Sequence, residues 1–171
     1  MKTALITGAS GEIGAAIARH FAGAGYGVAA HGAKHFEAAQ ALAASLRESG
    51  RTAVAVQGDL SDPETCARVF SESEAALGPI DVLVNGAGGN NPKGTTTGEY
   101  FDKADLLDET ARSFFDLDKD GVSFVFNLNF LGTLLTTQAF ARDMLETGGS
   151  IVNISSMNAY TPLTKIPAYS G

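Results

Sequence analysis

Short, continuously apolar segments alternate with alanine-rich helical patterns along the chain. Five apolar segments are predicted to be strands: Thr3–Thr7, Gly27–His31, Thr52–Gln57, Ile80–Asn85 and Ser150–Ser155. Helices are predicted between them: Glu12–Gly23, Phe36–Ser49, a helix that begins at Ser61–Glu64, and Val122–Glu146. Strands that are apolar throughout and separated by helices indicate a parallel sheet with helices on both faces. Because such crossovers are right-handed, the sequence predicts an α/β fold, a doubly wound sheet of about five strands in the order 3-2-1-4-5.

The alternation is interrupted between the fourth strand and the last helix. Residues 86–97 are rich in Gly, Asn and Thr and are expected to form a loop, and a polar, poorly periodic stretch continues to Asp116. The first half of the helix Val122–Glu146 is apolar nearly all round, which predicts burial on more than one side.

The composition of the chain favours some classes of protein and argues against others. A chain of 171 residues with 44% hydrophobic and 18% charged residues fits one globular domain, residues 1–171. Its net charge of -7 argues against a nucleic-acid partner, because a phosphate backbone attracts a basic face. No apolar run reaches about 18 residues and no basic leader precedes the first strand, so we expect no membrane span and a cytoplasmic location. Cys66 is the only cysteine, which fits a reducing compartment.

Three glycines stand between the first strand and the first helix. Gly8, Gly11 and Gly14 follow a buried strand directly, and this context makes a weak glycine pattern informative. Gly8 allows a tight turn, and the missing side chains let backbone N–H groups approach a pyrophosphate at the positive end of a helix. The spacing is not the usual G-x-G-x-x-G, and the alternative is a glycine-rich turn without a ligand.

Four motifs, in this order, resemble those of short-chain dehydrogenases/reductases. They are TGASGEIG at residues 7–14, GDL at 58–60, NGAG at 85–88 and ISS at 154–156. Within that family, residues 85–97, 114–137 and 155–169 look most like D-mannonate oxidoreductases. The resemblance covers the entire chain and implies a Rossmann-like fold. It also implies an NAD(P)-dependent oxidoreductase that interconverts a secondary alcohol and a ketone, on a sugar acid or polyol of the D-mannonate or D-fructuronate type.

The resemblance assigns cofactor-binding roles residue by residue. The pyrophosphate is expected to meet the turn residues Gly8, Ser10, Gly11, Ile13 and Gly14. The adenine amino group is expected to meet Asp59, with Leu60 beside it, and Asn85, Gly86 and Ala87 are expected to line the cofactor. The family usually has a second Asn where this chain has Gly86, which predicts a looser turn without loss of a reacting group.

The end of the second strand bears on the choice of cofactor. A carboxylate there would accept hydrogen bonds from the ribose hydroxyls and repel a 2′-phosphate. This chain has HGAKH at residues 31–35 and no carboxylate before Glu37. Lys34, helped by His31 or His35, is expected to meet a 2′-phosphate, so NADP(H) is favoured over NAD(H). The alternative is an exposed loop with solvated charges.

The catalytic roles also follow from the resemblance. Asn129, Ser156 and Tyr169 match the positions of the family's Asn, Ser and Tyr. Ser156 would hold the substrate oxygen, and Tyr169 would pass the proton while hydride moves to or from the nicotinamide. Asn129 would hold a water or local backbone. The alternative for Asn129 is a buried helix residue bonded to the backbone.

The family's lysine is expected four residues after Tyr169, beyond Gly171, and Tyr160 with Lys165 has the wrong spacing. The resemblance therefore predicts an inactive N-terminal fragment whose fifth strand is an exposed edge and whose C-terminal strands are missing. For the full-length protein it predicts a homo-oligomer. The alternative function is a non-catalytic nucleotide-binding module.

Two further signals concern ligands other than the cofactor. Lys93 and Lys165 lie in segments expected to border the substrate cleft and could meet a carboxylate, although solvated surface lysines are the alternative. Residues 116–121, DLDKDG, resemble the start of a calcium-binding loop, but the twelfth position is Asn127 and not Glu. Scattered histidines make no metal site, so we expect no metal.

Overall fold

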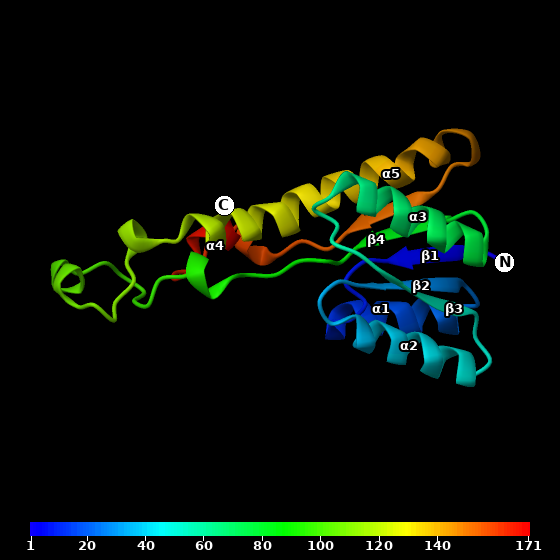
Figure 1. Cartoon of the computed structure of the whole chain (residues 1–171), viewed down its shortest axis with the longest axis horizontal. Helices are drawn as coiled ribbons and strands as arrows, with labels where there is room; N and C mark the ends of the chain where they lie inside the picture. The colour runs from blue at the N-terminus through cyan, green and yellow to red at the C-terminus, as the bar shows by residue number, and fades with distance from the viewer. The chain divides into compact units, whose positions relative to one another are not determined.

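The computed structural model describes residues 1–171, and its central feature is one parallel sheet (Figure 1). The strands are β1 (Thr3–Ile6), β2 (Gly27–Gly32), β3 (Ala53–Gln57), β4 (Val82–Asn85) and β5 (Ser150–Asn153). All pairs are parallel and the order is β3-β2-β1-β4-β5, which confirms the predicted topology. The register pairs Ile6 with both Ala30 and Val84, so the strands end at one common edge of the sheet.

The six α-helices and several shorter helices account for most of the remaining chain. The α-helices are α1 (Glu12–Gly23), α2 (Phe36–Glu48), α3 (Pro63–Leu77), α4 (Lys119–Phe126), α5 (Gly132–Thr147) and α6 (Pro167–Ser170). The 3-10 helices are η1 (Pro92–Gly94), η2 (Lys103–Leu107), η3 (Phe114–Asp116) and η5 (Met157–Ala159), and η4 (Asn127–Leu131) is a π-helix.

The residues group into two compact units. The first contains Met1–Ala87 and Leu131–Ile154, and therefore the whole sheet with α1, α2, α3 and α5. The second contains Gly88–Phe130 and Ser155–Gly171, with α4, α6 and the short 3-10 helices. A single domain over residues 1–171 stays a prediction.

Within the first unit, alternate residues of each strand serve opposite faces of the sheet. Ile6 belongs to the core under α1 and α2, whereas Leu5 belongs to the core under α3 and α5. In the second of these cores Phe70 and Phe140 meet edge to face, with ring centroids 5.8 Å apart. Cys66 is buried there, and burial raises the pKa of its thiol. The layers fix the carboxyl ends of the strands, where the site is expected.

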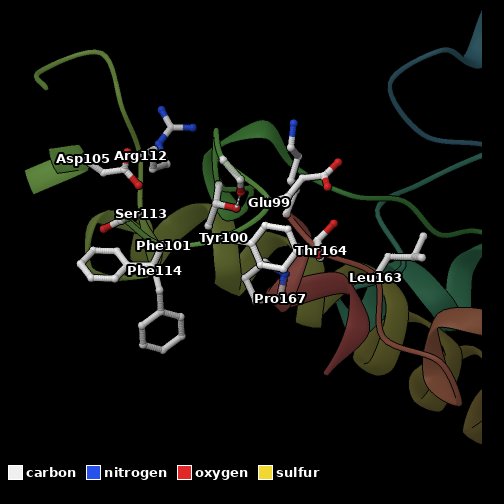
Figure 2. A pocket seen from close by; sticks show the side chains of 13 residues that line it. Glu99, Tyr100, Phe101, Asp105, Arg112, Ser113, Phe114, Leu163, Thr164 and Pro167 are labelled. Carbon is white, nitrogen blue, oxygen red and sulfur yellow. Dashed lines mark hydrogen bonds between the residues drawn. The ribbon is translucent and has the colours of Figure 1, made fainter. Parts of the chain in front are cut away.

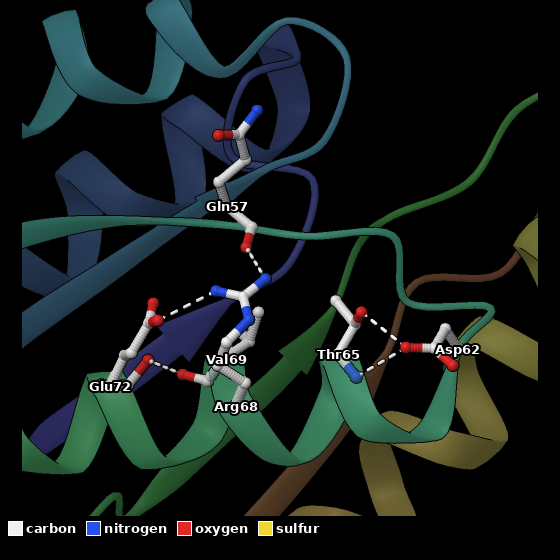
Figure 3. Close-up of polar contacts among 7 residues, drawn as sticks. Gln57, Asp62, Thr65, Arg68, Val69 and Glu72 are labelled. Atoms are coloured by element: carbon white, nitrogen blue, oxygen red, sulfur yellow. Dashed lines mark hydrogen bonds and ion pairs between the residues drawn. The ribbon is translucent and has the colours of Figure 1, made fainter.

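Helix α3 begins where the sequence predicts and is tied to β3 (Figure 3). Asp62 caps it by accepting hydrogen bonds from the backbone N–H of Thr65 at 2.8 Å and from the Thr65 hydroxyl at 2.6 Å. The Arg68 guanidinium donates to the carbonyl of Gln57 at 2.9 Å and pairs with Glu72 at 2.9 Å. The contact with Gln57 anchors the segment that leaves β3.

The predicted helix Val122–Glu146 differs from the observed one in three respects. The helical segment begins earlier, at Lys119, because the Asp118 carboxylate accepts the backbone N–H of Gly121 at 2.8 Å and caps it. It also contains the π-helix Asn127–Leu131. Burial on more than one side is not found throughout, since Phe126, Phe130 and Leu134 are exposed, Phe130 to 63%.

Strand β5 is an exposed edge, as the sequence predicts. It pairs with β4 at one end of the strand order, and all four of its residues are exposed. No helix combines the length and apolar character that crossing a membrane requires.

Candidate functional site

The β1–α1 turn is built around two glycines that packing requires. Gly8 has φ +70, a conformation that side chains disfavour, and an added Cβ would lie 2.8 Å from the Ala87 Cα. A Cβ on Gly14 would overlap the carbonyl oxygen of Gly8. The first turn of α1 therefore sits directly on the end of β1.

Gly11 lacks a side chain for a different reason. It is exposed, its φ is -95, and an added Cβ would meet only the Gly8 oxygen at an ordinary 3.5 Å. No side chain caps α1 at this residue. The start of the helix is thus open to an external anion, which a side chain at Gly11 would obstruct, and this opening fits a nucleotide pyrophosphate.

Thr7 ties the end of β4 to the turn. Its hydroxyl oxygen accepts the backbone N–H groups of Gly86 at 2.9 Å and of Ala87 at 3.1 Å. A Cβ on Gly86 would lie 2.8 Å from the Thr7 carbonyl oxygen. The prediction of a looser turn at Gly86 is therefore wrong, because the missing side chain permits a close contact between two strand ends.

Asn85 is a structural residue at the end of β4. It is 4% exposed, and its amide group donates to the Thr137 hydroxyl at 3.0 Å and to the Asn153 side-chain oxygen at 2.9 Å. Its own side-chain oxygen is buried without a partner. The side chain thus links β4, β5 and α5, and contact with a cofactor stays a prediction.

In the segment after β3, Leu60 is buried and Asp59 is exposed. Leu60 is buried in the core beneath α3. Asp59 is exposed, and one carboxylate oxygen accepts the backbone N–H of Ser61 at 3.0 Å and the Ser61 hydroxyl at 2.8 Å. A contact between Asp59 and an adenine amino group stays a prediction.

The end of β2 lies against the turn. A Cβ on Gly32 would be 3.3 Å from the Ser10 Cβ, so the strand end and the turn are in near contact. Lys34 follows and is exposed. Ile13, in the first turn of α1, is 67% exposed and offers an apolar surface beside the turn.

His31 corrects one prediction. It is 2% exposed, so it cannot help Lys34 to meet a phosphate. Its ring instead accepts the backbone N–H of Gly8 at Nδ1, 3.2 Å away, and its Nε2 lies 2.9 Å from the carbonyl oxygen of Gly58. The apolar spacing of β2 gave no indication of these ring contacts.

In the second unit, Asn129 holds the loop that follows β4. It lies in the π-helix, accepts the backbone N–H of Gly89 at 3.0 Å, and donates to the Gly89 carbonyl oxygen at 2.7 Å. It also donates to the carbonyl oxygen of Val125 at 2.7 Å. Holding local backbone is one of the two roles that the resemblance implies, and π-turns are frequent at functional sites.

Ser156 and Tyr169 belong to the same unit as Asn129. Ser156 caps η5, and its hydroxyl accepts the backbone N–H of Asn158 at 3.2 Å. Tyr169 lies in α6, which packs against η5. The three predicted catalytic residues therefore fall in one compact unit, and the predicted cofactor residues fall in the other.

The second unit also contains a pocket of about 230 Å³ (Figure 2). It is lined by Thr96, residues 98–101, Asp105, residues 112–114, residues 163–165 and Pro167, which include the cations Arg112 and Lys165 and the carboxylates Glu99 and Asp105. Lys165 has φ +69, and its carbonyl oxygen accepts the backbone N–H of Thr96 at 2.8 Å.

Several lining residues were not predicted, because residues 98–116 show no periodicity that would place them. They are Tyr100, Phe101, Arg112 and Phe114. Lys93 does not line this pocket: it lies in η1, against Gly121.

Two of the acidic residues in 116–120, Asp116 and Asp118, serve as helix caps. Asp116 accepts the Ser113 hydroxyl at 2.7 Å and its backbone N–H at 3.0 Å, and these bonds lower the pKa of Asp116. Asp118 caps α4 in the same manner, with its pKa lowered by the Gly121 backbone N–H. No group of three His, Cys, Asp or Glu side chains is placed to hold a metal ion.

Two similar proteins of known sequence are both named as oxidoreductases. An uncharacterized oxidoreductase of Haemophilus influenzae is 50% identical over 173 residues, which are 99% of this chain and 59% of the relative. The uncharacterized oxidoreductase UxuB of Bacillus subtilis is 40% identical, over 99% of this chain and 59% of its own length. The chain thus spans about three-fifths of the length of these relatives.

Solved structures of an oxidoreductase and a dehydrogenase match the fold of this chain over 99% of its length. A Haemophilus protein with bound NAD, to which D-mannonate oxidoreductase activity is attributed, has a TM-score of 0.91 at 48% identity, over 99% of this chain and 60% of that one. A gluconate 5-dehydrogenase from Burkholderia cenocepacia, in complex with NADP and tartrate, has a TM-score of 0.79 at 28% identity, over 99% and 59% of the two chains. The family model described as short chain dehydrogenase matches residues 2–171, and the chain belongs to that family.

Proposed function

We propose that this protein acts as an NAD(P)-dependent oxidoreductase that interconverts a secondary alcohol and a ketone. The observation that carries the proposal is the geometry of the β1–α1 turn. At Gly11, no side chain caps or obstructs the start of α1. Family membership and the oxidoreductase names of the relatives support it. A cytoplasmic location and a homo-oligomer remain predictions.

The proposed chemistry divides among three residues of the second unit. When bound, the nicotinamide would supply or accept the hydride. Ser156 would hold the substrate oxygen through its hydroxyl, and Tyr169 would exchange a proton with that oxygen. Asn129 would keep the Gly89 backbone in place through its paired hydrogen bonds. Because a tyrosine pKa near 10 leaves little phenolate at pH 7, the mechanism requires a nearby cation, and the family places a lysine four residues after Tyr169.

For the substrate, we propose a sugar acid of the D-mannonate or D-fructuronate type. The pocket of the second unit supports this, because Arg112 and Lys165 could meet a carboxylate. Arg112 is held in place by a 2.7 Å hydrogen bond from its guanidinium to the Pro92 carbonyl oxygen. Two structural relatives are named for activity on sugar acids, mannonate and gluconate.

For the cofactor, we propose that NADP(H) is favoured over NAD(H). No carboxylate stands between Gly32 and Glu37 to repel a 2′-phosphate, and Lys34 lies on the exposed side of that segment. Of the two solved relatives described above, the Haemophilus protein holds NAD and the gluconate 5-dehydrogenase holds NADP. Replacing Lys34 with Ala should weaken NADP(H) more than NAD(H), whereas Lys119→Ala, in the second unit, serves as the matched control.

Turnover by a chain of the relatives' length tests the proposal. Residues 1–171 would be joined to the C-terminal part of the Haemophilus oxidoreductase, and reduced nicotinamide followed with D-fructuronate, D-mannonate and neutral polyols. Tyr169→Phe should lower kcat by at least about a hundredfold and leave cofactor affinity nearly unchanged, because the hydroxyl serves proton transfer. Near-normal turnover by Tyr169→Phe would contradict the role of Tyr169 in proton transfer. Turnover of neutral polyols alone would contradict the proposal of a sugar-acid substrate.

A further inference from the structure

His31 joins two segments of the first unit that the sequence keeps far apart. Its Nδ1 lies 3.2 Å from the backbone nitrogen of Gly8, and its Nε2 lies 2.9 Å from the carbonyl oxygen of Gly58. A backbone N–H can only donate and a carbonyl can only accept. The ring must therefore be neutral with its proton on Nε2, and this tautomer alone satisfies both partners.

Both partners occupy constrained places beside the expected cofactor site. Gly8 has a left-handed φ and begins the turn expected to meet the pyrophosphate. Gly58 packs so closely on α3 that an added Cβ would overlap the Thr65 methyl group, and it directly precedes Asp59. The ring is 2% exposed, so it spans these segments inside the protein and does not reach a ligand.

We propose that neutral His31 is a positioning residue for the cofactor: it holds the Gly8 turn at a fixed distance from the Gly58–Asp59 segment. This inference rests on the proposed binding of NAD(P)(H) at the turn. Protonation of Nδ1 would set its N–H against the N–H of Gly8, break that hydrogen bond and loosen the turn. Cofactor affinity then falls as His31 becomes charged.

The direction of the pH effect follows from the surroundings of the ring. Burial lowers the pKa of His31, while the Gly58 carbonyl and the Asp59 carboxylate oppose this and raise it. The β1–α1 turn offers the ring only uncharged backbone, and the segment after β3 offers Asp59 as the charged group. Since the unfolded chain binds its proton near pH 6.5, the contribution to stability is complete above that pH and is lost as pH falls toward the lower native pKa.

The experiment measures cofactor affinity from pH 8 to about 5 by titration calorimetry. The unmodified chain should bind constantly at and above pH 6.5, and more weakly once the pH falls through the lowered pKa of His31. His31→Leu, which fills the space without either hydrogen bond, should bind about tenfold more weakly than the unmodified chain binds at pH 8, and this lower affinity should not change with pH. His31→Gln, which keeps one donor and one acceptor, should recover part of the affinity without the pH dependence. The exposed His20→Gln should behave as the unmodified chain does.

Imidazole nitrogen NMR of the cofactor-free chain provides a readout that needs no ligand. It should report His31 as the Nε2–H tautomer that titrates below 6.5, and a charged ring or an Nδ1–H tautomer at neutral pH overturns the proposal. If a folded His31→Leu chain binds with unchanged affinity and pH dependence, the proposal is also wrong. If the unmodified chain binds no cofactor, the proposed function fails while the NMR result still decides the state of the ring.

Discussion

At the scale of single residues, Gly11 and Gly14 lie in one turn but have different reasons to lack a side chain. A Cβ on Gly14 would overlap the Gly8 carbonyl oxygen, whereas a Cβ on Gly11 would lie at an ordinary 3.5 Å from that oxygen. Gly14→Ala should therefore lower the free energy of unfolding by about 1–3 kcal/mol, a typical effect of overpacking. Gly11→Ser should change it by only about a few tenths of a kcal/mol, because serine and glycine are similarly good residues at the N-cap of α1. Urea unfolding checks both, and equal effects would show that the close contact at Gly14 is not rigid.

His31 and Asn129 show which roles of single residues the sequence can predict and which it cannot. Asn129 was predicted, because a motif in family order carries its role, and the structure gives it a backbone partner in Gly89. His31 is one of the two histidines expected to help Lys34 meet a 2′-phosphate, but its side chain is buried. Its hydrogen bonds join residues 23 and 27 positions away, and no local pattern encodes such contacts.

At the scale of elements, the start of α3 depends on Asp62. The Thr65 hydroxyl and backbone N–H donate to its carboxylate and lower its pKa from 3.8. The cap thus contributes its full stability above about pH 4 and loses it as pH falls through the lower native pKa. Asp62→Ala should lower the melting temperature at pH 7 and flatten its fall toward pH 2. Asp62→Asn, a good cap without charge, should keep most of the stability at pH 7. Equal melting of Asp62→Ala and the unmodified chain would contradict the role.

The elements themselves could largely be predicted, since strands buried on both faces give continuous apolar runs and Gly or Pro mark their ends. The helix predicted from about Glu12 to Gly23 is confirmed, and helix α3 begins within the predicted Ser61–Glu64. The π-helix Asn127–Leu131 could not be predicted, because one wider turn leaves the apolar spacing almost unchanged. The pocket segment 98–116 lacks periodicity, so its aromatic lining was also missed.

At the scale of the whole molecule, the proposal distributes cofactor and substrate recognition between two compact units. Lys165, in the pocket of the second unit, should contribute to substrate affinity and little to the chemical step. In the chimera, Lys165→Met should raise KM for D-fructuronate about tenfold with kcat nearly unchanged, which is the signature of lost uniform binding. Lys103→Met, outside the pocket lining, is the matched control. An unchanged KM would exclude Lys165 from substrate binding.

The central claim is that the β1–α1 turn binds the pyrophosphate of a nicotinamide cofactor, and Gly11→Asp tests it most directly. Aspartate is a favourable helix cap, and the site has room for its Cβ, so the variant should fold at least as stably as the unmodified chain. Its carboxylate would occupy the anion site at the start of α1 and repel the negatively charged pyrophosphate. Titration calorimetry with NADP(H) and NAD(H) should detect binding to the unmodified chain and a loss of at least about a hundredfold in Gly11→Asp. No binding of either cofactor to the folded unmodified chain, or equal binding by the folded variant, would contradict the account.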